Sequence, residues 1–291
     1  MASVGFRTVA VPDPREDKPI SVAILYPTEA AGEPTAFGPF TLEVARGAEI
    51  RDGRFRLVLI SHGMGGSPMT HRLLARHLAA SGFVVALVEH SFDNRNDTSR
   101  TGTVRALSDR PHQLRTVADW FLQGSGFQSR LAGETFAVIG HSLGGYSALA
   151  LAGGIAASLP DEEPDGQPRR IDTVQDPRVA ALVLLAPATP WFRESGSLAG
   201  VDVPILLLAG GKDPHCPPAL MAEPLLSAVA RPERVRYRLI DDAGHYSFLS
   251  PWPPAMRNPG FPPSQDPPGF DRDSFMEVLQ AEVLDFLAET L

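Results

Sequence analysis

A serine stands between two glycines at the spacing G-x-S-x-G in the segment Gly140–Gly145. This pattern is typical of a sharp strand-to-helix turn that exposes a nucleophilic serine above a sheet. Glycines are needed because the two backbones approach closely there, and because glycine tolerates unusual dihedral angles. An apolar run ends at Ile139 and a helical pattern begins at Leu143, which is the context that the turn requires. The segment predicts Ser142 as a nucleophile, with a purely structural glycine-rich turn as the alternative.

A serine nucleophile needs a general base, and the base needs a carboxylate that fixes its tautomer and stabilises its cation. The chain order expected with this turn is serine, then acid, then histidine. Asp213 follows the apolar run Ile205–Leu208, and His245 follows the run Val235–Ile240. Both stand just past the carboxyl ends of predicted strands, where open α/β sheets place their sites. We therefore predict Asp213 as the acid and His245 as the base.

Other residues compete for these two roles. Asp241 and Asp242 are alternative acids, although both stand on the loop of the base itself. His90 ends a predicted strand and is the alternative base, whereas His215 is placed to line the pocket. The structural alternatives are a turn role for the predicted acid and a surface-loop role for the predicted base.

Negative charge that develops on a carbonyl oxygen needs two preorganised hydrogen-bond donors. One is the backbone N–H of Leu143, which directly follows the nucleophile at a helix N-terminus. The second is expected from the glycine-rich segment Ser61–Gly66, with the N–H of Met64 as the donor and Gly63 supplying the conformation. A phosphate-binding role for this segment is disfavoured because the chain lacks G-x-x-x-x-G-K-[ST].

With these residues the chain resembles the serine α/β-hydrolases, in particular the bacterial group described as predicted dienelactone hydrolases, related to the platelet-activating-factor acetylhydrolases. The resemblance implies an α/β-hydrolase fold and cleavage of carboxylic esters through an acyl-enzyme intermediate, without a cofactor. The segments that carry it are Ser61–Gly66, Leu74–His90, Gly140–Gly145, Ala209–Asp213, Ala243–Phe248 and the opening Arg7–Pro27.

Two departures limit what the resemblance implies about substrate. True dienelactone hydrolases use a cysteine at the turn where Ser142 stands, and the single cysteine, Cys216, lies elsewhere. The acetylhydrolases place their acid soon after the strand that follows the nucleophile, where Leu184–Ala188 contains no carboxylate. Neither lactone nor phospholipid specificity is therefore expected to transfer.

Apolar runs rich in β-branched residues alternate with helix-length amphipathic segments along the chain. This alternation predicts a mostly parallel central sheet with helices on both faces. The first two runs, Val4–Val11 and Ile20–Tyr26, are predicted to form an antiparallel hairpin at the N-terminal edge of the sheet. Further predicted strands are Leu57–Ile60, Phe83–Val88, Phe136–Ile139, Val179–Leu185, Ile205–Leu208 and Val235–Ile240, and predicted helices are Met69–Ser81, His112–Gln123, Leu143–Ala157 and one that starts near Asp273 or Ser274.

Three loop insertions interrupt the alternation, near 159–177, 187–200 and 250–269, and no linker divides the chain. We expect a single domain over 1–291. The proline-rich insertion at 250–269 closely follows His245, and we expect a stiff rim beside the site because proline reduces backbone freedom.

The expected substrate-binding residues come from the glycine-rich segment, from the helix after the predicted nucleophile and from two aromatic loop positions. Apolar walls with few polar groups suit an acyl or alkoxy chain. The arginines at 95, 100 and 105 are predicted to be a solvated stretch, with a site for a substrate carboxylate as the alternative. The substrate-binding residues are His62, Gly63, Phe92, Tyr146 and Trp191.

Composition excludes several classes of protein. The 291 residues carry a net charge of −8 and are 43% hydrophobic, which disfavours disorder and a nucleic-acid partner. One cysteine forms no internal disulfide, and no metal-ligand pair such as H-E-x-x-H occurs, so no metal site is predicted. We find no membrane-spanning apolar run and no signal peptide, so a cytoplasmic protein is expected, or a secreted one if a signal peptide was removed.

The function expected from the residues is hydrolysis of small or medium carboxylic esters by a Ser-His-Asp triad. One alternative keeps the same triad but cleaves polyesters or transfers the acyl group. Another is a non-catalytic ligand-binding protein on a hydrolase scaffold.

Overall fold

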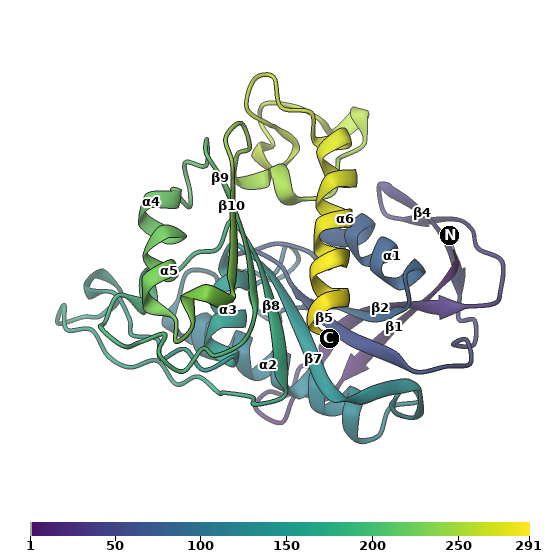
Figure 1. The fold of residues 1–291 in the computed structure, drawn as a ribbon, viewed down its shortest axis with the longest axis horizontal. Helices are drawn as coiled ribbons and strands as arrows, with labels where there is room; N and C mark the ends of the chain where they lie inside the picture. The colour runs from purple at the N-terminus through teal and green to yellow at the C-terminus, as the bar shows by residue number, and fades with distance from the viewer. Residues whose placement is uncertain (1) are drawn as a thin grey trace.

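The computed structural model describes residues 2–291, and its ten strands form one sheet in the order β10-β9-β8-β7-β5-β6-β2-β1-β4-β3 (Figure 1). Neighbouring strands from β10 to β6 are all parallel. The mostly parallel sheet is therefore confirmed. The strands are β1 Ser3–Val11, β2 Ile20–Thr28, β3 Glu33–Phe37, β4 Phe40–Arg46, β5 Phe55–Ser61, β6 Phe83–Glu89, β7 Leu131–His141, β8 Val179–Leu185, β9 Ile205–Gly210 and β10 Val235–Ile240.

The N-terminal hairpin forms as expected, because β1 and β2 pair antiparallel from Ser3–Thr28 to Val11–Ile20. It does not occupy the edge itself. A second hairpin, β3–β4, continues the sheet beyond β1, and this hairpin is absent from the sequence prediction. Strand β3 is largely exposed and β4 alternates buried with exposed residues, so both lack the dense apolar pattern that marks the central strands.

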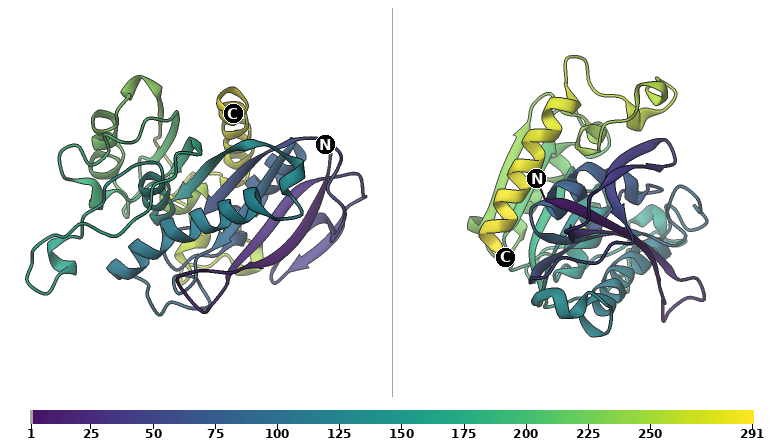
Figure 2. Two further views of the ribbon diagram at one scale, coloured as in Figure 1. Left: turned by 90° about the horizontal axis from the view of Figure 1, so that it is seen from below. Right: turned by 90° about the vertical axis from the view of Figure 1, so that its right-hand side faces the viewer.

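Helices cover both faces of the sheet, as predicted. Helices α2 and α3 pack on one face and α1 and α6 on the other (Figure 2). Alternate residues of the central strand β5 enter the two cores: Leu57 and Leu59 pack with α2 and α3, whereas Val58 and Ile60 pack with α1 and α6. The helices are α1 Arg72–Ala80, α2 Val104–Gln123, α3 Leu143–Leu151, α4 Pro218–Met221, α5 Glu223–Ala228 and α6 Arg272–Thr290.

The largest differences from the predicted helix boundaries are in α2 and α3. Helix α2 begins eight residues earlier than the predicted start at His112, capped by the Thr103 hydroxyl, and it contains Pro111 in its interior. Proline usually ends or kinks a helix, which is why the sequence favoured a later start. Helix α3 ends at Leu151, because Gly153 turns the chain at φ +122°.

The three predicted insertions are loops with short 3₁₀ turns at Pro160–Glu162, Pro190–Phe192, Pro254–Met256 and Pro262–Ser264. A single domain over 1–291 stays a prediction. In the described range 2–291, no helix is both long and apolar enough to cross a membrane.

Candidate active site

Ser142 stands at the turn between β7 and α3, with φ 54° and ψ −120°. These angles are sparsely populated by non-glycine residues, and such strain clusters at functional sites. Every other residue from Phe136 to Leu151 is buried, whereas Ser142 is partly exposed. A Cβ on Gly140 would collide with the carbonyl of Gly144, so the tight turn requires glycine there. The turn therefore presents the serine side chain to solvent.

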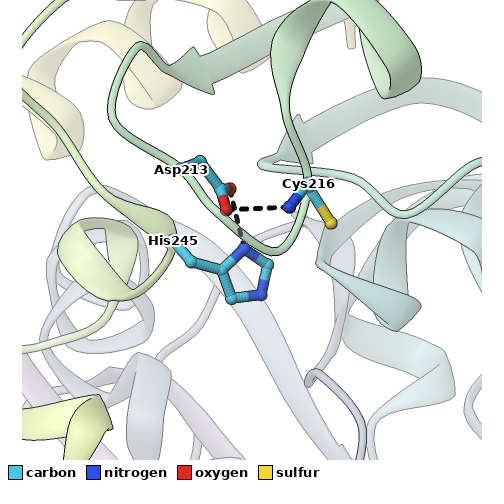
Figure 3. Close-up of side chains that lie close together, drawn as sticks. All are labelled: Asp213, Cys216 and His245. Atoms are coloured by element: carbon cyan, nitrogen blue, oxygen red, sulfur yellow. Dashed lines mark hydrogen bonds and ion pairs between the residues drawn. The ribbon is translucent and has the colours of Figure 1, made fainter.

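Asp213 and His245 come together from the loops after β9 and β10. Asp213 Oδ2 lies 2.8 Å from His245 Nδ1, and the two residues are only 5% and 6% exposed (Figure 3). The other carboxylate oxygen accepts backbone N–H bonds of 2.8 Å from both His215 and Cys216. Burial raises the pKa of Asp213, but the bonds and charge of His245 outweigh it and leave that pKa below its usual value. The carboxylate is thus ionised and fixed against the imidazole.

The alternative acids and the alternative base lie in different surroundings. Asp241 and Asp242 are exposed. His90 is buried, with Nε2 2.8 Å from Ser61 Oγ and Nδ1 2.9 Å from Gln113 Oε1. Burial, followed by the charge of Arg110, holds the pKa of His90 well below its usual value. Both ring nitrogens are engaged within the core, which leaves His245 as the histidine paired with a carboxylate beside the turn.

His141 precedes the nucleophile and fixes the backbone of His245. Its Nε2 donates to the His245 carbonyl at 2.9 Å, and the two ring centroids are 4.9 Å apart. Within residues 2–291, no hydrogen bond joins Ser142 Oγ to the His245 ring. Bonds of this kind are often long in enzymes without substrate and tighten when substrate binds.

Cys216 lies beside this pair, although the sequence offered no reason to place it there. Burial, followed by the charge of Asp213, raises the pKa of the Cys216 thiol to about 12, and a hydrogen bond with Ser142 opposes the shift. Cys216, Asp213 and His245 have ligand atoms within 4.8 Å of one another. Metal binding would require a thiolate and would compete with the Asp213–His245 bond, so the chemistry of this cluster fits an acid–base pair better than a metal site.

The two predicted oxyanion donors flank the nucleophile. Leu143 is the first residue of α3, so its N–H has no intrahelical acceptor. The glycine-rich loop passes close to the turn, because a Cβ placed on Gly63 would lie 3.3 Å from Ser142 Cβ. Within residues 2–291, the N–H of Met64 makes no hydrogen bond. Two backbone donors therefore lie on segments adjacent to the serine.

Two clefts open beside the Met64 side chain, which is 50% exposed and lines both. The first, of about 390 Å³, includes Gly63 and His141, and we call it the aromatic cleft. The second, of about 730 Å³, includes Leu143 and Trp191, and we call it the acidic cleft. The aromatic cleft is completed mainly by Phe40, Tyr246, Leu249, Trp252, Phe261 and Pro263, and the acidic cleft by Asp161 and Glu162 with the segment 102–107.

The predicted wall residues divide into two groups. Gly63 and Trp191 line clefts, and their role in substrate binding stays a prediction. His62 lies in the core, where its ring bonds to the Gly63 carbonyl at 2.7 Å. Phe92 packs against Arg100, whose guanidinium carbon lies 3.9 Å from the centroid of the Phe92 ring. Tyr146 is fully buried and bonds to a backbone carbonyl of α2. These three side chains line neither cleft.

The proline-rich segment 250–269 lies beside the site. Trp252, Phe261 and Pro263 form part of the aromatic cleft. Arg272, at the start of α6, bonds to Asp266 and to the carbonyls of Pro263 and Gln265. These contacts fasten the segment to the body of the protein, in keeping with the expected rim.

Arginines 100 and 105 are part of an ion-pair network and not a free basic stretch. Both bond to Glu16, at 2.6 and 2.8 Å, and both contact Asp109. Arg95 is exposed and lines the aromatic cleft. These ion pairs connect the turn of the N-terminal hairpin to helix α2.

Sequence reasoning did not single out Asp93 and Arg110, which form a buried ion pair of 2.7 Å beneath the glycine-rich loop. The signal was present in the periodicity of α2. Arg110 falls between Leu107 and Leu114, three and four residues from apolar positions of the buried stripe. A charged residue in that register must find a partner in the interior.

Comparisons with known proteins find ester hydrolases that are similar to this chain. The family model described as platelet-activating factor acetylhydrolase, isoform II, matches residues 32–122. The cutinase est2 of Thermobifida alba is 24% identical over 237 residues, which cover 76% of this chain and 67% of that protein. The chain is an ester-cleaving serine hydrolase that is similar to the dienelactone hydrolase and platelet-activating-factor acetylhydrolase group.

Two solved structures show the fold of this hydrolase at full length. A ferulic acid esterase from Streptomyces cinnamoneus superimposes with a TM-score of 0.70 at 21% identity, covering 99% of this chain and 89% of that one. A dienelactone hydrolase from Anabaena variabilis gives a TM-score of 0.60 at 17% identity, covering 98% of each chain. The α/β-hydrolase fold predicted from the sequence is confirmed.

Proposed function

We propose that this hydrolase cleaves small or medium carboxylic esters with Ser142 as nucleophile, His245 as general base and Asp213 as the residue that orients the base. The single observation that carries the proposal is the 2.8 Å contact between Asp213 Oδ2 and His245 Nδ1 beside a serine on a strained turn. A buried carboxylate on Nδ1 fixes the tautomer whose Nε2 can accept a proton.

The proposed reaction has two stages. In the first, Ser142 Oγ attacks the ester carbonyl carbon while His245 Nε2 takes the hydroxyl proton, and that proton then passes to the departing alcohol. In the second, His245 removes a proton from water, which attacks the acyl-enzyme and releases the acid and Ser142. The backbone N–H groups of Met64 and Leu143 donate to the carbonyl oxygen as it becomes negative.

Met64 lines both clefts, which supports an ester whose acyl and alcohol portions occupy one cleft each. Apolar surface in the aromatic cleft suits a hydrophobic acyl or aryl group, and the open acidic cleft suits a polar portion. Because neither cleft is closed, the same arrangement also fits a segment of a longer ester chain. Polyester cleavage and acyl transfer with the same triad therefore stay as alternatives.

A small-molecule ester is the partner proposed for this site, with neither a cofactor nor a metal. The absence of a nucleic-acid partner and the cytoplasmic or secreted location stay predictions from charge and from the N-terminal sequence. The ligand-binding alternative predicts an unreactive serine, which the experiment below distinguishes.

The test replaces Ser142 with Ala and measures hydrolysis of p-nitrophenyl acetate, butyrate and octanoate. We expect loss of turnover with an unchanged circular dichroism spectrum, and labelling of the wild type at Ser142 by a fluorophosphonate. The control is Ser195→Ala, at an exposed loop serine, which should keep full activity. Retained turnover in the Ser142→Ala protein would reject the proposed nucleophile, and an unlabelled folded wild type would favour the ligand-binding alternative.

A further inference from the structure

Arg110 is the largest fully buried side chain of the protein's described residues, and all three nitrogens of its guanidinium are bonded. It extends from α2 beneath the region between the glycine-rich loop and the nucleophile turn. Its Nη1 donates to Asp93 Oδ2 at 2.7 Å, and its Nε donates to Ser147 Oγ at 3.1 Å. Its Nη2 donates to the backbone carbonyl of His62.

Two of these bonds lead to the glycine-rich loop on either side of Met64. The His62 carbonyl is held directly by Arg110. Asp93, paired with the same guanidinium, accepts a bond of 2.9 Å from the backbone N–H of Gly65. The His62–Gly63 peptide unit and the Met64–Gly65 peptide unit are therefore both anchored to one buried ion pair.

The third bond leads to the helix that carries the other oxyanion donor. Ser147 Oγ accepts from Arg110 Nε and donates to the Leu143 carbonyl at 3.0 Å. Leu143 is the first residue of α3, and its own N–H is the other predicted oxyanion donor. One planar guanidinium thus spans the two chain segments that supply the two donors.

The surroundings of this guanidinium are uncharged apart from Asp93. Burial, followed by the Arg110 charge, lowers the pKa of His62 to about 3. His90 is likewise held neutral and accepts from Ser61. A buried ion pair in such a setting holds its geometry tightly, because any displacement leaves a charge without a partner.

We propose that Arg110 is a positioning residue of the oxyanion hole, whose guanidinium sets the separation of the Met64 and Leu143 N–H groups so that both reach one oxygen. This inference rests on the proposed function. Arg110 touches no reacting atom and acts through Asp93, the His62 carbonyl and Ser147. Arginine is required because a fork of fixed geometry makes three divergent bonds, which the single ammonium of lysine does not reproduce.

The decisive variant is Arg110→Lys, which keeps the positive charge opposite Asp93 and removes the fork. Small misplacement of a catalytic group costs about 100-fold in rate. We expect kcat for p-nitrophenyl butyrate to fall roughly 30- to 100-fold while KM changes less than about threefold, the pattern of a group that acts only in the transition state. The control is Arg178→Lys, which alters a paired arginine at the start of β8 and should leave kcat unchanged.

A trifluoromethyl ketone separates positioning from general loss of structure. This inhibitor adds to the serine and forms a negatively charged oxygen, so its affinity reports the oxyanion hole. Its inhibition constant should weaken by the same factor as kcat/KM, whereas the binding of an amide analogue that remains uncharged should not change. An unaltered kcat, or equal weakening of both inhibitors, would overturn the positioning role.

If Arg110→Lys does not fold, Ser147→Ala takes its place, since it removes only the link from Arg110 to Leu143. We expect kcat to fall about 10-fold and the affinity for the ketone to fall in parallel. If neither the activity nor the affinity for the ketone changed, the proposal would be overturned. A failure of the proposed function is detected by a separate measurement, because the fluorophosphonate would then not label Ser142 of the wild type. In that case the ketone would fail to bind the wild type, and the positioning role would fall as well.

Discussion

The Tyr146 hydroxyl donates to the backbone carbonyl of Leu107 at 3.2 Å, and Leu107 is the residue four positions before Pro111 in helix α2. Proline has no N–H, so the helix leaves this carbonyl without its normal intrahelical donor. Tyr146 replaces the missing donor from the neighbouring helix α3. The tyrosine is therefore a structural partner of Pro111 and not the wall of a substrate pocket.

Tyr146→Phe should lower stability without altering catalysis. Removing the hydroxyl leaves a buried carbonyl unsatisfied, which costs about 1–3 kcal/mol of unfolding free energy. Urea unfolding measures the loss, and kcat/KM for p-nitrophenyl butyrate should stay within about twofold of wild type. The matched control is Tyr237→Phe, because the Tyr237 hydroxyl has no partner within residues 2–291. A large change in KM for Tyr146→Phe would restore its predicted role in substrate binding.

Asp213→Asn should leave the fold intact and nearly abolish turnover. The amide can hold His245 in the wrong tautomer and cannot stabilise its cation, so we expect kcat to fall roughly 1,000- to 10,000-fold. Steady-state hydrolysis of p-nitrophenyl butyrate gives the number. Asp241→Asn and Asp242→Asn, at the exposed alternative acids, are the controls. If either control lost as much activity as Asp213→Asn, the acid would have to be reassigned.

Gly144→Ala should destabilise the nucleophile turn. A Cβ at this position would overlap the Ser61 carbonyl of β5, and backbone cannot move aside as a flexible side chain can. Overpacking of this kind costs about 1–3 kcal/mol or more. Thermal unfolding should show a clearly lowered Tm, with activity reduced further because Ser142 is displaced. Gly126→Ala, where a Cβ meets no atom within 4 Å, should behave as wild type; a similar Tm for both variants would contradict the close-packing argument.

Glu16 should make stability depend on pH in the acidic range. The hydrogen bond from Arg100 is the main cause that lowers the pKa of Glu16 from 4.5 to about 2 in the folded protein. Burial raises this pKa, but the further hydrogen bond from Arg105 adds to the lowering. A carboxyl whose folded pKa is depressed contributes stability above its unfolded pKa and loses that contribution as the pH falls toward the folded value. The ion pairs therefore stabilise the protein above about pH 4.5 and progressively less below it.

The test compares the Tm of wild type and Glu16→Gln from pH 7 to pH 3. At pH 7 we expect a Tm difference between the two proteins that is equivalent to about 1 kcal/mol, the scale of a partly exposed ion-pair network. This Tm difference should become smaller below pH 4.5. Glu289→Gln, which removes an exposed pair with Arg236, is the control and should show a smaller gap. A gap that stays constant down to pH 3 would show that the charge of Glu16 is not responsible.

Local sequence patterns were sufficient to predict the central strands and the three proposed triad residues. Ser142 is marked by glycines that the tight turn requires, and strands such as Val179–Leu185 are marked by dense apolar runs. Asp213 and His245 are each identified by the strand that precedes them. The β3–β4 hairpin was missed because its strands are half exposed and paired mainly with each other.

Chain order and residue type by themselves predicted a serine turn after β7, and an acid and a base after β9 and β10, of a mostly parallel sheet. Tertiary structure alone decided which side chains meet across the molecule. The contact of His245 with the Asp213 carboxylate, the bond of Tyr146 to the helix of Pro111, and the bond of Arg110 to the glycine-rich loop all join segments that no sequence spacing relates. The physical reason is that buried polar groups must be satisfied wherever packing places them, and packing is set by the whole fold.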